Sequence, residues 1–206
     1  MTAFEKTICS AFGLNGKKWL ATLPDTIGDL EKKWGLSEMT PVSNMSYHYV
    51  AKARCSLNGP VVIKIGCDQE LAKREASLLK ANRSGKMICL LGYDQKHGAL
   101  LMREAQPGTT LKKLYPQKLG QVIQSYAALA LDLHSYKKID KSHYPHVSKW
   151  LKPLDGVRPQ TIDEKLFSRA KAVKNELLAS KKGSKLLHGD LHLENILKDG
   201  EGWVCI

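Results

Sequence analysis

The chain lacks the features that mark secreted, disulfide-linked or membrane-spanning proteins. Its five cysteines are an odd number and form no C-x-x-C pair, so neither a disulfide framework nor a zinc site is indicated. No apolar run approaches the roughly 18 residues that a membrane-spanning helix needs. The start, with Glu5 and Lys6 ahead of a short apolar run, lacks the charge order and length of a secretion signal. We therefore expect a cytoplasmic protein that does not act at a membrane.

Acidic residues are few relative to basic ones. The 32 lysines and arginines against 20 aspartates and glutamates give a net charge of +12, which raises the question of a nucleic-acid partner. The lysines, however, come as scattered pairs without interleaved aromatic residues or an RNA-binding motif. We therefore expect a solvated basic surface that helps to attract a nucleotide and has no nucleic-acid partner. A non-catalytic basic protein that binds nucleotides or nucleic acid remains an open alternative.

The apolar pattern changes from strand to helix along the chain. After two short amphipathic helices, expected at residues 4–11 and 26–34, strand patterns appear at 47–53, 61–65, 87–91 and 99–102. Residues 103–108 have linker character, and helical periodicity follows at 119–133 and 166–178. This order predicts an α+β protein with a β-rich first part and a helical second part.

Lys64 lies inside the apolar strand at 61–65, where a lysine is costly to bury without an anion. Glu75, on the helix that follows, shares a face with apolar residues and can reach back to that strand. A Lys64–Glu75 ion pair would hold the lysine against nucleotide phosphates. Glu70 is the competing partner, and an edge-strand lysine that extends into solvent is the other interpretation.

The segment HGDLHLEN at residues 188–195 holds Asp190 and Asn195 in the order D-x-x-x-x-N. In a phosphoryl-transfer loop, such an Asp accepts the proton of the attacking hydroxyl and the Asn binds Mg²⁺. A strand, turn and strand are expected over 196–206. Two alternatives remain: a metal-dependent hydrolase built on His188, Asp190 and His192, and a polar turn without chemistry.

The loop expected to cover the nucleotide contains no glycine. Residues 43–47 would hold phosphates through Ser46 and backbone N–H groups in place of a glycine-rich loop. Backbone groups of Met102, Arg103 and Glu104 could bind an adenine edge, although a plain connection between strand and helix fits the same residues.

With these residues in place, the sequence resembles the aminoglycoside/hydroxyurea antibiotic resistance kinase family, which includes streptomycin 6-kinases. The likeness covers nearly the whole chain. It rests on HGDLHLEN, Lys64, Glu75 and Pro107-Gly108, and on the opening pattern of residues 16–20, 23–24, 34–36, 46–47 and 50. The resemblance implies a protein-kinase-like fold of two lobes, with a β-rich N-terminal lobe over residues 1–103 and an incomplete helical C-terminal lobe over 104–206.

The resemblance also implies the chemistry. ATP and Mg²⁺ would be the cofactors, and a hydroxyl of a small molecule, such as an aminoglycoside, would accept the phosphate. Asp190 would be the catalytic base, Asn195 a Mg²⁺ ligand, and Lys64 the phosphate-binding lysine with Glu75 as its partner. Such kinases use a second metal-binding Asp after the strand that corresponds to residues 203–206. We therefore expect a C-terminally truncated chain with little activity of its own.

Overall fold

The computed structural model describes residues 1–82, 84–136, 143–180 and 182–206. The chain divides into two compact units, one made of Met1–Asp132 with His188–Ile206 and the other of Leu133–Leu187. The predicted lobes, residues 1–103 and 104–206, divide the chain at a different point, and their boundary stays a prediction. The α+β class itself is confirmed, because the chain combines two antiparallel sheets with helices that lie before and between their strands.

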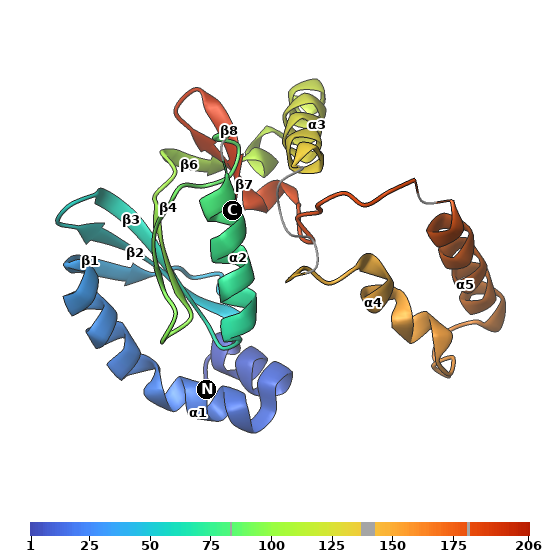
Figure 1. Ribbon diagram of the computed structural model, residues 1–206, viewed down its shortest axis with the longest axis horizontal. Helices are drawn as coiled ribbons and strands as arrows, with labels where there is room; N and C mark the ends of the chain where they lie inside the picture. The colour runs from blue at the N-terminus through green and yellow to red at the C-terminus, as the bar shows by residue number, and fades with distance from the viewer. Residues whose placement is uncertain (83, 137–142, 181) are drawn as a thin grey trace. The chain divides into compact units, whose positions relative to one another are not determined.

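The first unit is built on a five-stranded antiparallel sheet (Figure 1). In chain order its strands are β1 (Leu36–Pro41), β2 (His48–Cys55), β3 (Gly59–Gly66), β4 (Leu90–Asp94) and β5 (Ala99–Arg103). In space they follow the order β1-β2-β3-β5-β4. Along the central strand β3, Val61, Ile63 and Ile65 are fully buried, as expected where alternate side chains of a strand face a core.

Two strand predictions differ in outcome. The strand expected at 99–102 is β5, and its prediction is confirmed. The strand expected at 87–91 begins only at Leu90 and continues to Asp94. Met87 instead forms an isolated parallel bridge with Cys205, a partner far away in the sequence. Local apolar patterning could not predict this long-range pairing.

A long N-terminal helix, α1 (Ala3–Trp34), contributes Leu23 and Leu30 to the core on one face of the sheet, against Ile63 and Ile65. Thr2 and Glu5 form a capping box at its start. The prediction of two short helices separated by an irregular segment was wrong. Helical structure continues through residues 14–25, with a kink at Gly13, where φ is 56° and ψ is −129°.

On the face of the sheet opposite to α1, helix α2 (Gln69–Ala81) brings Glu75 close to the central strand β3. The Asp68 side chain caps the helix by accepting hydrogen bonds from the N–H groups of Glu70 and Leu71. The buried positions of α2 are Ala72, Ala76 and Leu79. The small side chains of Ala72 and Ala76 allow the helix to approach the sheet closely, as the Lys64–Glu75 contact described below requires.

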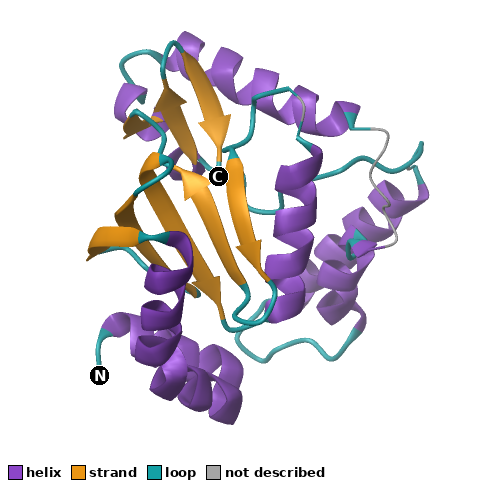
Figure 2. Ribbon diagram, turned by 60° about the vertical axis from the view of Figure 1, so that its left-hand side comes forward, coloured by secondary structure: helices purple, strands orange, loops and turns teal. Residues whose placement is uncertain are grey.

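A second sheet in the same unit has the order β6-β7-β8. Its strands are labelled in Figure 1, and Figure 2 shows the strands of both sheets in orange. Its strands are β6 (Pro107–Thr110), β7 (Ile196–Asp199) and β8 (Gly202–Cys205). The short 3₁₀ helix η1 (Leu111–Leu114) follows β6, and the 3₁₀ helix η4 (Leu193–Asn195) precedes β7. The predicted hairpin over 196–206 is confirmed. The linker expected at 103–108 is only partly irregular, because β6 begins at Pro107 and pairs with β7.

Part of helix α3 (Leu119–Ser135) packs against this sheet. Val122 and Leu129 form a core cluster with Leu111 and Ile196. The helix predicted over 119–133 is therefore confirmed, but its apolar stripe is wider than its buried face. Ile123 remains 58% exposed.

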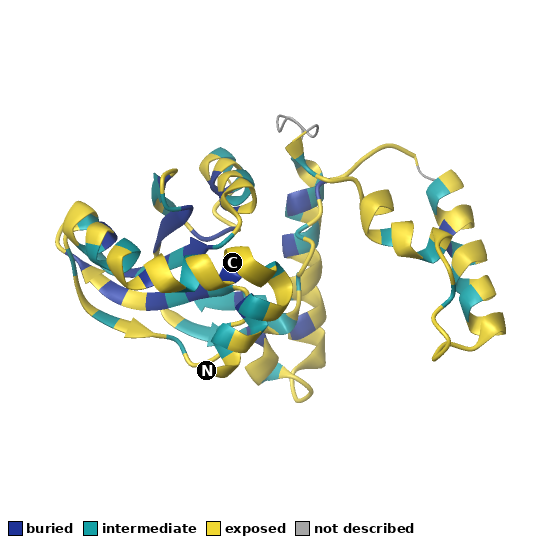
Figure 3. Ribbon diagram, turned by 90° about the horizontal axis from the view of Figure 1, so that it is seen from below, coloured by how far each residue is buried: buried dark blue, intermediate teal, exposed yellow. Residues whose placement is uncertain are grey.

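The second unit contains α4 (Val147–Leu151), the 3₁₀ helix η3 (Lys152–Asp155) and α5 (Glu164–Ala179). The helix predicted over 166–178 is confirmed as α5. Lys174, which forms an ion pair with Asp155, is the buried residue of α5, and α4 has none (Figure 3). Among the described residues, we find no helix with the length and apolar character to cross a membrane.

Candidate active site

Lys64 and Glu75 form an ion pair in the first unit. The Lys64 Nζ lies 2.8 Å from both carboxylate oxygens of Glu75. The two side chains are 22% and 28% exposed, so they are shielded but reachable from solvent. Of the two carboxylates that were considered from the sequence, Glu75 and not Glu70 is the partner. An ammonium group has three N–H donors, so the Lys64 side chain can donate a further hydrogen bond to an anion.

Asp190 and Asn195 are held together by hydrogen bonds within one tight segment. The Asn195 side-chain amide donates to the Asp190 carbonyl oxygen at 2.9 Å and to its carboxylate at 3.3 Å. Among the described residues, no donor binds the Asn195 Oδ1, which leaves the amide oxygen available to a hard cation. The Asp190 carboxylate is 78% exposed, with His192 at 3.6 Å. A ligand can therefore reach both oxygens.

His188 lies near both this segment and the ion pair. Its Nε2 lies 3.0 Å from the Ile206 carbonyl oxygen, and its Nδ1 lies 3.3 Å from the N–H of Asp190. Burial lowers the pKa of His188, against the raising effects of the Ile206 carbonyl and of the Asp190 and Glu75 carboxylates, while Lys64 lowers it further. Asp190, Glu75 and Lys64 thus all lie within electrostatic reach of one imidazole.

The metal-hydrolase alternative finds no support in this geometry. Within residues 1–82, 84–136, 143–180 and 182–206, no three His, Cys, Asp or Glu side chains are placed to hold a metal ion. His188 and His192 instead bind backbone groups, because each Nδ1 accepts the N–H two residues further along. These two histidines therefore stabilise the conformation of the loop through hydrogen bonds to its backbone.

The loop between β1 and β2 contains Ser46, as expected. Ser46 is exposed, so its hydroxyl is free to contact a ligand. The loop is closed at its base by the Val42 N–H, which donates to the Val50 carbonyl oxygen at 3.0 Å.

The last residue of β5 and the residue after it use their backbone donors within the protein. The N–H groups of Arg103 and Glu104 donate to the carbonyl oxygens of Cys89 and Pro60 at 2.9 and 3.2 Å. Their side chains form ion pairs, Arg103 with Asp199 at 2.5 Å and Glu104 with Lys52 at 2.6 Å. These two N–H groups are therefore not available to an adenine.

Ala105 was missed by the sequence reasoning. It is 5% exposed, and its N–H has no acceptor among the residues that the structure describes. A nearly buried donor without a partner is a position that a ligand acceptor can fill. An alanine side chain carries no chemical signal, so only its place after β5 could have suggested it.

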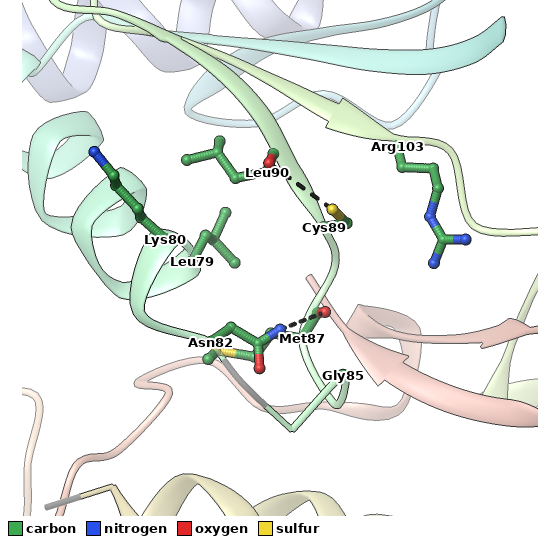
Figure 4. A pocket seen from close by; sticks show the side chains of 8 residues that line it. All are labelled: Leu79, Lys80, Asn82, Gly85, Met87, Cys89, Leu90 and Arg103. Carbon is green, nitrogen blue, oxygen red and sulfur yellow. Dashed lines mark hydrogen bonds between the residues drawn. The ribbon is translucent and has the colours of Figure 1, made fainter. Parts of the chain in front are cut away.

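A hollow of about 340 Å³ lies elsewhere on the first unit (Figure 4). It is lined by Leu79, Lys80, Asn82, Gly85, Met87, Cys89, Leu90 and Arg103. Arg103, which was expected beside an adenine, lines it, but none of the residues singled out for phosphate binding or catalysis does. We therefore place the candidate active site at the ion pair and the Asp190 segment, and not in this hollow.

His48 is the second residue that the sequence reasoning missed. It is the first residue of β2, and it lies opposite Gly66 in the pairing with β3. Burial, followed by the charge of Lys64, lowers its pKa to about 4, against the raising effects of Glu75 and Asp68. The signal available in the sequence was its position directly after the loop that contains Ser46.

Comparison with solved structures identifies the fold as that of small-molecule kinases. A choline/ethanolamine kinase family protein from Mesorhizobium loti aligns with a TM-score of 0.59 and 17% identity over 87% of this chain and 63% of that one. The aminoglycoside phosphotransferase APH(4)-Ia, in a complex with ADP and hygromycin B, gives 0.59 and 16% over 87% and 69%. A streptomycin–ATP complex of APH(2")-IIa gives 0.55 and 14% over 87% and 68%.

The chain thus spans less than two thirds of the length of the Mesorhizobium loti protein. The protein-kinase-like fold is confirmed by these alignments.

The comparison with curated proteins gave no match. A family model described as aminoglycoside/hydroxyurea antibiotic resistance kinase matches residues 33–206. Because this match covers most of the sequence, including the Lys64–Glu75 pair and the Asp190 segment, the chain belongs to the aminoglycoside/hydroxyurea antibiotic resistance kinase family.

Proposed function

We propose that this chain carries the nucleotide-binding and catalytic residues of a phosphotransferase that moves the γ-phosphate of ATP to a hydroxyl group of a small molecule. The observation that supports this most strongly is the placement of the Lys64–Glu75 pair and of Asp190 around His188. A phosphate-binding cation and a base are needed at one site for phosphoryl transfer. Membership of the kinase family supports the same reaction.

The nucleotide would be held mainly by the first sheet. Lys64, kept in place by Glu75, would contact the phosphates, and the exposed Ser46 hydroxyl would add a donor. Residues Met102 to Glu104 would form the wall beside the adenine. The unpaired N–H of Ala105 suits an acceptor on the adenine edge.

Asp190 would accept the proton of the attacking hydroxyl, and Asn195 would bind Mg²⁺ through its Oδ1. The hydrogen bonds from the Asn195 amide keep both side chains in position for these roles. Bound Mg²⁺ would neutralise charge on the nucleotide phosphates. A positioned general base contributes about 10²- to 10⁴-fold to the rate.

An aminoglycoside, such as streptomycin, is the acceptor that we propose. The family description names aminoglycosides, and the aligned complexes contain hygromycin B and streptomycin. The exposed Asp190 carboxylate would attract a cationic acceptor as well as accept its proton. Because the proposed reaction consumes ATP, we expect the protein to act in the cytoplasm.

The test combines nucleotide binding with single-turnover transfer of labelled γ-phosphate to streptomycin and a panel of other aminoglycosides. Asp190→Asn should lower the transfer rate about 100-fold or more and leave ATP–Mg²⁺ affinity nearly unchanged, because only the base is lost. Lys64→Ala should weaken ATP binding itself. Lys96→Ala is the matched control, since this lysine is 76% exposed at the turn between β4 and β5.

Equal transfer rates for the protein and Asp190→Asn would contradict the proposed role of the base. If the protein bound no ATP but bound nucleic acid with a steep salt dependence, a non-catalytic basic protein would be the better description. Binding measurements separate these outcomes even if the rate of the 206-residue chain is low.

A further inference from the structure

His48 occupies a position on the sheet that the proposed roles do not use. In the antiparallel pairing of β2 with β3, His48 lies opposite Gly66 and Val50 lies opposite Lys64. Tyr49 and Ala51 belong to the core that α1 covers. Because side chains alternate along a strand, His48 projects from the opposite face, the one from which Lys64 projects.

The absence of a side chain at Gly66 makes room for the imidazole. A Cβ atom on Gly66 would lie 3.2 Å from the His48 Cδ2 and 3.6 Å from its Nε2. The ring therefore extends across β3 toward the end of the strand, two residues beyond Lys64. The same region contains Asp68, which caps α2 and acts electrostatically on the ring.

The ring nitrogens of His48 are available for binding. Neither has a hydrogen-bond partner among the described residues, and neither is among the fully enclosed polar atoms without a partner. With its pKa lowered to about 4 by burial and by Lys64, the imidazole is neutral near pH 7. A neutral imidazole carries one N–H donor and one acceptor, so it can donate to an oxygen without adding charge.

We propose that His48 donates a hydrogen bond to a phosphate oxygen of the bound nucleotide and so contributes to phosphate binding where residues 43–47 provide no glycine. This inference rests on the proposed function. It assigns to the start of β2 a side-chain donor that complements the charge of Lys64. The ligand group that His48 would recognise is the phosphate chain of a nucleoside diphosphate or triphosphate, and not the adenine or the ribose.

The experiment measures the dissociation constants of adenosine, ADP and ATP by calorimetry, with Mg²⁺ present, for the protein and for His48 variants. His48→Ala should weaken ADP and ATP binding about 10- to 100-fold, the range for a hydrogen bond to a charged group, and leave adenosine binding unchanged. His48→Gln, whose amide N–H has a similar reach, should recover most of the affinity. His48→Phe, which keeps a ring without a donor, should behave like the alanine variant.

Arg54→Ala is the control, because Arg54 lies at the far end of β2 and is 59% exposed. Melting temperatures establish that each variant is folded, and the comparison of His48→Gln with His48→Phe carries the test if His48→Ala does not fold. Unchanged ADP and ATP affinities in His48→Phe would overturn the inference. Equal losses for adenosine and ATP would also overturn it, since they indicate a structural role. Absence of ATP binding by the unsubstituted protein would instead refute the proposed function.

Discussion

At the residue scale, Asp94 is a buried carboxylate that joins α1 to the turn between β4 and β5. It is 4% exposed. The Lys33 Nζ lies 2.6 Å from one of its oxygens, and the His97 N–H donates to the other at 2.8 Å. Burial alone would raise the pKa of Asp94, but the hydrogen bonds and charges of Lys33 and His97 outweigh it and hold the pKa below the usual range of an aspartate.

Asp94→Asn should therefore reduce the free energy of unfolding at neutral pH by about 1–3 kcal/mol, because a buried hydrogen-bonded charge is lost. A depressed carboxyl pKa contributes stability above its unfolded value, and this contribution disappears as the pH falls through the folded value. The difference between the protein and the variant should thus be constant at pH 6–7 and shrink below about pH 4. Urea unfolding at several pH values measures this difference in free energy of unfolding.

Asp25→Asn is the control, because Asp25 is exposed, and it should alter the free energy of unfolding by less than about 0.5 kcal/mol. An effect as large as that of Asp94→Asn would contradict the stabilising role of the buried carboxylate.

At the element scale, α1 depends on two glycines in different ways. Gly13 forms the kink, and the short helical segment before it folds back so that Ile8 contacts Gly16. A Cβ on Gly16 would lie 2.6 Å from the Ile8 carbonyl oxygen, whereas a Cβ on Gly28 would meet nothing within 4 Å. Close backbone contact, and not helix propensity, therefore requires glycine at position 16.

Gly16→Ala should destabilise the protein by about 1–3 kcal/mol, because the backbone of Ile8 must shift to relieve the overlap. Gly28→Ala should stabilise it by about 0.5–1 kcal/mol, since alanine is the better helix former in open space. Parallel denaturant titrations of the two variants provide the measurement. A stabilising effect at both positions would show that the two parts of α1 do not pack as described.

At the scale of the whole molecule, large apolar side chains remain exposed on several helices. Leu131 of α3 is 67% exposed, Trp150 of α4 74%, and Leu166 and Leu177 of α5 63% and 64%. Exposed apolar surface of this kind favours association. The net charge of +12 opposes it, and salt screens that repulsion.

We expect the 206-residue chain to self-associate as its concentration rises, and more strongly at high than at low ionic strength. Trp150→Ser and Leu177→Ser should weaken the association. Leu57→Ser should not, because this residue, although 90% exposed, is an isolated side chain at the turn between β2 and β3. Sedimentation velocity at several concentrations and salt levels measures the effect. A monomer under all conditions would contradict the expectation.

The sequence by itself determined the features whose spacing follows from local geometry. The run of β-branched apolar residues at 61–65 predicted a strand, and helical spacing placed Glu75 on the side of its helix that faces that strand. The hairpin at 196–206 was predictable from turn residues between short apolar runs. These signals are local, because each depends on residues that are neighbours along the chain.

Only the tertiary structure decided which groups meet and which groups remain unpaired. The pairing of β2 with β3 places His48 over Gly66, and the pairing of β5 with its neighbours consumes the N–H groups of Arg103 and Glu104 but not that of Ala105. The bridge of Met87 to Cys205 likewise joins segments that are distant in the sequence. Strand register and backbone pairing arise from contacts over long separations, and a single sequence carries no local pattern for them.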